Sequence, residues 1–192
     1  MNRFSPETPS KPPRKVLVMG IGNSLLQDDG VGVHVVDALR TDFRGDWLRL
    51  ALEPRIIDAG TVGLALLPTV EDADTVIVVD AAEIGLAPGA LRVFHNGDID
   101  RLLSGKRRTV HEVALADLFA AAALRGRTPA RRALIAIQPG SIDWGLNPTP
   151  AVKAAIPRAC GAVWALLKSW QAPRREQARY SRSLPRRERK SA

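Results

Sequence analysis

Apolar and polar positions along the chain fall into blocks that predict strands and helices in turn. Short apolar runs with the composition of buried strands occupy residues 16–19, 75–80 and 133–137, and residues 55–58 are a further strand candidate. Residues 91–95 alternate between apolar and polar positions, as expected for a strand at a sheet edge. Helical spacing or helix-start signals mark residues 30–43, 63–70, 110–124 and 150–170. Strands separated by helices predict a three-layer α/β fold, in which a mostly parallel sheet is flanked by helices on both faces.

Two of these helices begin with recognisable capping signals. Thr109 and Glu112 fit a capping box, with Thr109 as N-cap and Glu112 at the third helical position. Thr149 and Pro150 suit the start of the last helix, because proline is favoured at the first helical position. Pro157 lies within that helix and is expected to kink or divide it.

The charge of the chain is concentrated at its ends. The net charge is +8, yet residues 16–172 hold 16 basic and 17 acidic side chains, while residues 173–192 hold eight basic and two acidic ones. We therefore expect one folded domain over residues 15–172, an N-terminal extension at 1–14 and a basic, disordered tail at 173–192. The tail could contact RNA or an acidic partner. A neutral domain makes nucleic acid an unexpected partner, and a solvated extension is the simpler interpretation.

Composition also limits where the protein works. No apolar run approaches the roughly 18 residues that a membrane span requires, so we expect no membrane partner. The first residues lead into proline and lysine rather than an apolar stretch, which predicts no signal peptide. Cys160 is the only cysteine, as suits a reducing compartment. We expect a monomeric cytoplasmic protein.

Three side chains at the ends of predicted elements are candidates for chemistry. Ligands of α/β sheets bind beyond the carboxyl ends of the strands, and Asp29 and Asp80 both fall there. His111 falls in the first turn of a predicted helix. Two carboxylates and an imidazole gathered at one edge would make a small hydrolytic metal site.

Each candidate also has a purely structural interpretation. Asp28 or Asp29 could cap the following helix, Asp80 could start a turn, and His111 could be a surface or capping residue. Asp58 ends its strand as Asp80 does, and it could support the site, cap the next helix or do neither.

The remaining conspicuous side chains are assigned to structure. We expect His34 to be solvated and His95 to lie in a turn, and we expect Trp144 and Trp164 to be packing groups. Gly20 and Gly22 follow a strand as in a dinucleotide site, but Leu25 stands at the third glycine position and two aspartates follow. Carboxylates repel a pyrophosphate, so no nucleotide cofactor is expected.

The segment Gly20-Ile21-Gly22-Asn23 through Asp28-Asp29-Gly30-Val31-Gly32 resembles the opening signature of the NiFe-hydrogenase maturation endopeptidases. Further segments match the same family in order: 58–61, 78–81, His111 with 115–118, and 145–150. The resemblance covers about residues 15–170 and implies a twisted, largely parallel sheet flanked by helices.

The resemblance implies both an activity and a site. Members of the family remove a short C-terminal extension from the precursor of the hydrogenase large subunit after nickel insertion. The family's metal ligands map onto Asp29, Asp80 and His111, with Asp29 and Asp80 catalytic. Asp28 is assigned to supporting or capping work, and Asp58 to support. The expected cofactor is nickel supplied by the precursor, although another divalent metal could occupy the site. The basic tail after about Pro173 departs from the family pattern.

Three alternatives stay open at this stage. Asp29 and Asp80 could share a proton as an aspartic-protease pair, which would leave His111 without a role. The protein could be a nickel-sensing or chaperone-like protein that binds the precursor without cutting it. It could also bind RNA through residues 173–192, with an affinity that falls steeply with salt.

Overall fold

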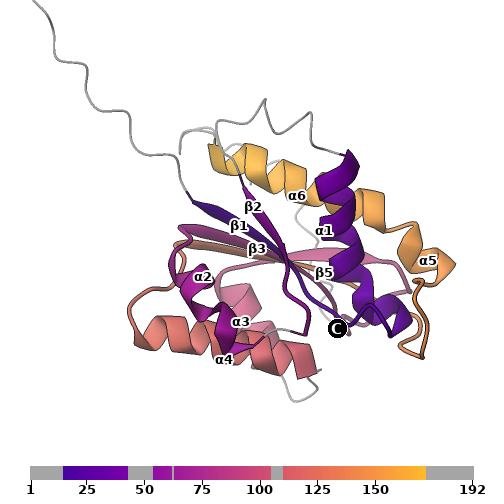
Figure 1. The fold of residues 1–192 in the computed structure, drawn as a ribbon, viewed down its shortest axis with the longest axis horizontal. Coiled ribbons are helices and arrows are strands. Elements are labelled where there is room, and N and C mark those ends of the chain that lie inside the picture. The colour runs from indigo at the N-terminus through magenta and orange to yellow at the C-terminus, as the bar shows by residue number, and fades with distance from the viewer. Residues whose placement is uncertain (1–14, 43–53, 62, 105–109, 172–192) are drawn as a thin grey trace, which may run out of the picture.

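The computed structural model describes residues 15–42, 54–61, 63–104 and 110–171 (Figure 1). They form a five-stranded sheet in the order β2-β1-β3-β5-β4. All neighbouring strands pair in parallel except β4, which is antiparallel to β5. The strands are β1 (Val16–Gly20), β2 (Arg55–Asp58), β3 (Thr75–Ala81), β4 (Leu91–His95) and β5 (Arg131–Ile137).

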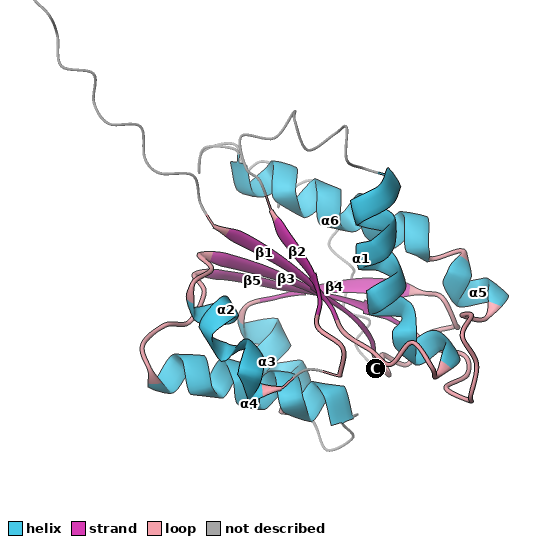
Figure 2. Ribbon diagram, viewed as in Figure 1, coloured by secondary structure: helices cyan, strands magenta, loops and turns pink. Residues whose placement is uncertain are grey.

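Helices cover both faces of this sheet and complete a three-layer sandwich (Figure 2). One layer holds α1 (Val31–Asp42), α5 (Pro150–Lys153) and α6 (Ile156–Gln171). The other holds α2 (Leu67–Glu71), α3 (Gly97–Leu103) and α4 (Val110–Leu124). Two short 3-10 turns, η1 (Gln27–Gly30) and η3 (Leu64–Leu66), precede α1 and α2.

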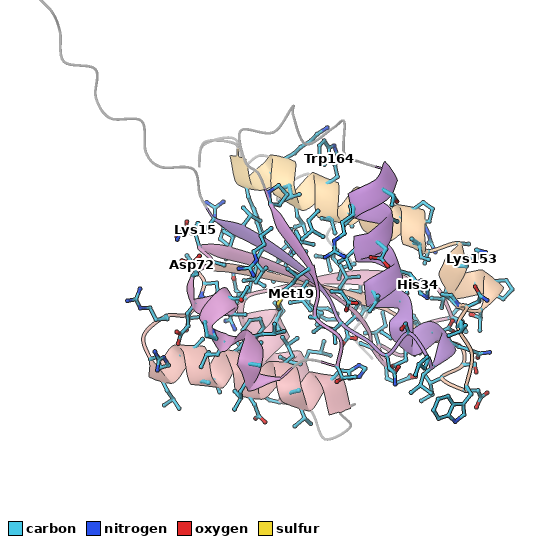
Figure 3. All side chains as sticks on the ribbon, in the orientation of Figure 1. Lys15, Met19, His34, Asp72, Lys153 and Trp164 are labelled. Atoms are coloured by element: carbon cyan, nitrogen blue, oxygen red, sulfur yellow. The ribbon has the colours of Figure 1, made fainter. Side chains whose placement is uncertain are left out.

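The central strands β1, β3 and β5 are buried because each sheet face packs against its own helical layer. Alternate residues of β3 illustrate this: Ile77 and Val79 pack with α1 and α6, whereas Val76 and Val78 pack toward α4. Met19 of β1, labelled in Figure 3, belongs to the α4 side. Central strands that are covered on both faces must be apolar throughout, which explains their continuous apolar sequence.

Three close approaches explain the glycines around η1. A Cβ on Gly20 would lie 2.1 Å from the carbonyl oxygen of Gly32, and one on Gly32 would lie 2.2 Å from that of Ile21. Gly22 has a φ of +141° and sits against the Asp29 carbonyl, where a Cβ would approach to 1.9 Å. Only residues without a side chain let η1 and α1 press onto the ends of β1 and β3 in this way.

The predicted architecture is confirmed, with three differences of detail. The segment 91–95 is an edge strand, as expected. The last helix is divided into α5 and α6 ahead of Pro157, also as expected. The helix predicted at 63–70 is split into η3 and α2. Helix α3 was not predicted, because Asn96, Gly97 and Asp98 resemble a turn and the helix is only 7 residues long. His95 is the last residue of β4 rather than a turn residue.

Other predictions lie outside the described residues. These are the capping box, which depends on Thr109, and the proposed tails at 1–14 and 173–192. Within the described residues, no helix combines the length and apolarity that a bilayer crossing requires.

Candidate active site

Asp29, Asp80 and His111 lie together at the carboxyl edge of the sheet. Asp29 belongs to η1, just before α1, and Asp80 is near the end of β3. His111 is in the first turn of α4. In Figure 1 the N-terminal ends of α1 and α4 point to this edge from opposite faces of the sheet.

The imidazole has one ring nitrogen near each carboxylate. His111 Nε2 lies 3.6 Å from Asp29 Oδ2, and His111 Nδ1 lies 3.7 Å from Asp80 Oδ1. The side chains of His111 and Asp80 are 8% and 1% exposed, whereas that of Asp29 is 15% exposed. Asp29 is therefore the member most open to an approaching substrate, and Asp80 lies deepest.

The sequence places these side chains through ordinary strand and helix periodicity. Asp80 follows Val76 and Val78 at two-residue spacing, so it points to the α4 side of the sheet. His111 precedes the buried Leu115 by four residues and shares its helix face, which is directed at the sheet. The backbone N–H of Asn23 donates to Asp29 Oδ2 at 2.9 Å and fixes that carboxylate in the loop after β1.

Asp28 has a different role from Asp29. Its carboxylate is fully buried and accepts four hydrogen bonds, all from the segment between β5 and α5. The donors are the backbone N–H groups of Gly140, Ser141 and Thr149 and the hydroxyl of Thr149, at 2.6–3.0 Å. The predicted supporting role of Asp28 thus has a concrete form: it ties the 140–149 loop to the turn that carries Asp29.

Backbone pairing strengthens the same connection. The N–H of Gln27 donates to the carbonyl of Gly145 at 2.8 Å, and the N–H of Gly145 donates to the carbonyl of Leu25 at 2.9 Å. Gln27 adopts a φ of +39°, which is strained for a residue with a side chain. In Figure 1 the orange loop before α5 runs beside the turn that begins α1.

Gln138 is a supporting residue that the sequence interpretation missed. It is buried directly after β5, and its Oε1 accepts from the N–H groups of Ile84 and Leu86 at 3.0 and 3.3 Å. Its Nε2 donates to Glu83 at 2.9 Å. A polar residue at the end of an apolar strand was the signal that drew attention to Asp80, and it would have found Gln138 as well.

The structure assigns other candidates to local or different roles. Asp58 Oδ1 accepts from the N–H of Gly60 at 2.8 Å and so closes its own turn, and Gly63 rather than Asp58 begins the next helical turn. Thr149 begins α5 as predicted, but its hydroxyl donates to Asp28 rather than capping the helix.

Two aromatic predictions were wrong. Trp144 is 80% exposed and is not a packing group, because its loop is held by backbone bonds instead. His34 of α1 (labelled in Figure 3) is half-buried, with Nε2 enclosed, and is not solvated. Trp164 of α6 is half-buried, with Lys168 Nζ 5.2 Å from its ring centre.

The donor set suits a divalent metal, but the side chains do not converge on one point. Two carboxylates and an imidazole match ions of borderline hardness such as Ni²⁺ and Zn²⁺. Donors to one ion must each lie about 2.0–2.2 Å from it, whereas the two His111 nitrogens face different carboxylates. Among the described residues, no three His, Cys, Asp or Glu side chains form a ready-made site. Ligation of one ion by all three residues would require His111 to turn.

Comparison with known proteins identifies the relatives of this chain. A family model described as hydrogenase maturation protease matches residues 33–166. The chain belongs to the hydrogenase maturation protease family. Asp80 and His111 fall inside the matched segment, and Asp29 precedes it.

Individual relatives of this protease family agree. The hydrogenase expression/formation protein HupD of Rhodobacter capsulatus is 36% identical, over 84% of this chain and 75% of its own length. The hydrogenase 2 maturation protease of Escherichia coli strain K12 is 31% identical, over 80% and 91%. Among solved structures, the hydrogenase maturating endopeptidase HybD of E. coli superposes with a TM-score of 0.71 at 31% identity, covering 80% of this chain and 92% of HybD. These findings confirm the family resemblance and the predicted fold class.

Proposed function

We propose that this member of the maturation protease family is an endopeptidase that removes the C-terminal extension of the NiFe-hydrogenase large-subunit precursor after nickel insertion. The observation that carries the proposal is the enclosed imidazole of His111 between two carboxylates at the carboxyl edge of the sheet. Family membership supplies the peptidase class. We propose that the reaction takes place in the cytoplasm and that the protein acts as a monomer.

The three side chains take different roles according to their exposure. Asp29 meets the substrate because it is the most exposed of the three. Its Oδ2 accepts from the N–H of Asn23 and faces the imidazole of His111. His111 holds or moves a proton at Nε2, next to Asp29. Asp80 lies behind His111 and orients the ring through Nδ1, since a buried carboxylate beside an imidazole favours one tautomer and stabilises its positive charge.

Asp29, Asp80 and His111 are also the residues that would hold a divalent metal. When bound, such a metal supplies Lewis acidity toward the scissile carbonyl and lowers the pKa of bound water. We infer that the nickel belongs to the precursor and reaches these residues as part of the substrate. Free protein should then bind nickel weakly, because the three donors do not converge without it.

An aspartic-protease pair is the less favoured mechanism. Such a pair requires two carboxylates close enough to share a proton. Here each carboxylate is near a different nitrogen of the same imidazole. The ring therefore has a place in the site that the paired-aspartate mechanism does not use.

The proposal is tested with purified protein and purified precursor, with and without nickel loaded. We expect the nickel-loaded precursor to lose its C-terminal extension, seen as a mass decrease, and the nickel-free precursor to stay intact. A nickel-sensing or chaperone-like protein would bind the precursor and leave its mass unchanged, and that result would overturn the endopeptidase assignment. Cleavage of both precursors alike would retain the protease and reject the nickel requirement.

A further inference from the structure

Large apolar side chains stand exposed beside the candidate active site. Ile142, Trp144 and Leu146 of the loop after β5 are 60%, 80% and 66% exposed, and Leu25 of the facing segment is 48% exposed. We call these four residues the apolar rim. Single exposed apolar residues are common on protein surfaces, but several of them on two paired segments form a patch that calls for an explanation.

The rim is carried by an ordered part of the protein. The buried Asp28 carboxylate binds the loop at both of its ends, at Gly140 and Ser141 and again at Thr149. Gly145 pairs with the Leu25 segment through two backbone hydrogen bonds. Burying a carboxylate costs free energy unless hydrogen bonds compensate for its lost water. The four hydrogen bonds of Asp28 offset this cost and hold in place a loop whose largest side chains are exposed to solvent.

The rim is also directly attached to the catalytic residues. The N–H of Asp29 donates to the carbonyl of Leu26 at 2.9 Å, and Leu26 pairs with Gly145. Leu25 of the rim therefore lies in the same turn as Asp29, and the other rim residues lie on the segment that pairs with this turn through Gly145. A molecule seated on the rim would therefore contact the segment that carries the carboxylate that we assign to meet the substrate.

We propose that the apolar rim is the docking surface for the protein substrate, and that it binds an apolar face of the large-subunit precursor next to the scissile bond. This proposal rests on the proposed function. Interface cores are enriched in aromatic and aliphatic side chains, and exposed tryptophans are frequent centres of binding energy. Trp144 is the central anchor of the surface.

Two other occupants match the rim less well. Residues 173–192 of the same chain carry eight basic side chains, with Tyr180 and Leu184 as their only large apolar ones. Such a segment does not complement an apolar patch. A second copy of the chain seated on the rim would cover Asp29, which the substrate must reach.

The test compares Trp144→Ala with Leu124→Ala, using the full-length protein and the purified nickel-loaded precursor. Leu124 is 90% exposed at the end of α4, far from the carboxyl edge, so it matches Trp144 in exposure but not in place. We expect Trp144→Ala to raise KM by about tenfold or more, with kcat within about twofold of the wild type. Leu124→Ala should change neither. Equal KM values for the two variants would overturn the docking surface.

A binding measurement separates this proposal from the proposed function. The dissociation constant for the precursor is measured in the Asp80→Asn background, with and without Trp144→Ala, at about 0.5 M salt to screen the basic tail. Tenfold weaker binding with Trp144→Ala supports docking at the rim, even if the wild type never cuts the precursor and the endopeptidase assignment fails. Unchanged binding, or no binding by either protein, overturns the rim even if the wild type cuts.

Discussion

Charged side chains at the two edges of the sheet differ in their exposure to solvent. At the amino edge, two ion pairs are solvent-exposed: Lys15 with Asp72, which Figure 3 shows side by side, and Arg101 with Asp98. At the carboxyl edge, Asp28 and Asp80 are buried, and Asp80 lies beside the enclosed ring of His111. The strands that join the two edges are the same, so the difference arises in the loops and helix ends.

The difference indicates that the protein buries charged side chains, at a cost in stability, at the edge that holds the candidate active site. Exposed ion pairs contribute about 0–1 kcal/mol each and cost little to form. Buried carboxylates cost several kcal/mol unless they are fully bonded. Asp28 meets that requirement with four hydrogen bonds. Asp80 is equally buried beside an imidazole, and this arrangement is the one on which its proposed catalytic role rests.

The largest effect is expected at Asp80. Asp80→Asn keeps the shape of the side chain but removes the negative charge behind His111 Nδ1. Precursor cleavage should fall by about 10³-fold or more, while the circular dichroism spectrum is preserved. Glu83→Gln is the control, since Glu83 lies at the same edge and the amide oxygen still accepts from Gln138. Normal mature subunit formed by Asp80→Asn would remove Asp80 from the site.

A second large effect is expected where the glycines let η1 approach the sheet. Gly32→Ala would place a Cβ 2.2 Å from Ile21 O and 2.3 Å from Val79 O, both rigid backbone atoms. The free energy of unfolding should fall by about 3 kcal/mol or more. Gly161→Ala on α6 is the matched control, because nothing lies within 4 Å of its Cβ, and it should gain about 0.5–1 kcal/mol. Denaturant midpoints measure both, and equal changes would mean that the close approach is not a constraint.

Removing the Asp28 carboxylate should lower the free energy of unfolding by less than Gly32→Ala can. Asp28→Ala leaves three N–H groups and a hydroxyl without their acceptor. We expect a loss of about 2–4 kcal/mol in the free energy of unfolding, together with slower precursor cleavage. Thr149→Val removes only the hydroxyl bond and should cost about 1 kcal/mol. If Asp28→Ala and Thr149→Val were both as stable as the wild type, the 140–149 loop would be held by something other than Asp28.

The strands and the three catalytic candidates could be predicted because each depends on a local pattern. The run 75–80 is apolar up to Asp80, and a parallel sheet brings such strand ends to one edge. The two adjacent aspartates could be recognised as more than one cap requires. Their division of labour could not be predicted, because the partners of Asp28 lie 112 to 121 residues away.

The errors have the same origin. Trp144 was assigned to packing on residue type alone, yet its loop is fixed by Asp28 and by Gly145, which leaves the indole outside. Gln138 was overlooked because an amide carries no charge, although its role depends on contacts with a loop more than fifty residues earlier. Long-range hydrogen bonds between loops have no signature in local periodicity.

At the amino edge, a small effect is expected from breaking an ion pair. Lys15 and Asp72 are both 63% exposed, so Asp72→Ala should change the free energy of unfolding by less than about 0.5 kcal/mol. Asp100→Ala should cost about 1 kcal/mol, because Arg132 is only 12% exposed and bonds both oxygens of Asp100. Both are measured by urea denaturation. A loss above about 2 kcal/mol for Asp72→Ala would contradict the contrast between the edges.

The smallest effect is expected at His95, the last residue of β4, which lies at the amino edge. Burial lowers the pKa of His95 below 6.5, and this outweighs the opposing attraction of Asp98. The unfolded chain therefore binds a proton more readily than the folded one, so stability should rise with pH from the folded pKa up to the unfolded value and be constant above it. His95→Asn should lack this rise, which urea midpoints at about pH 5 and 7.5 would reveal. A wild type that instead gained stability on acidification would mean that Asp98 prevails, and that the amino edge stabilises charge throughout.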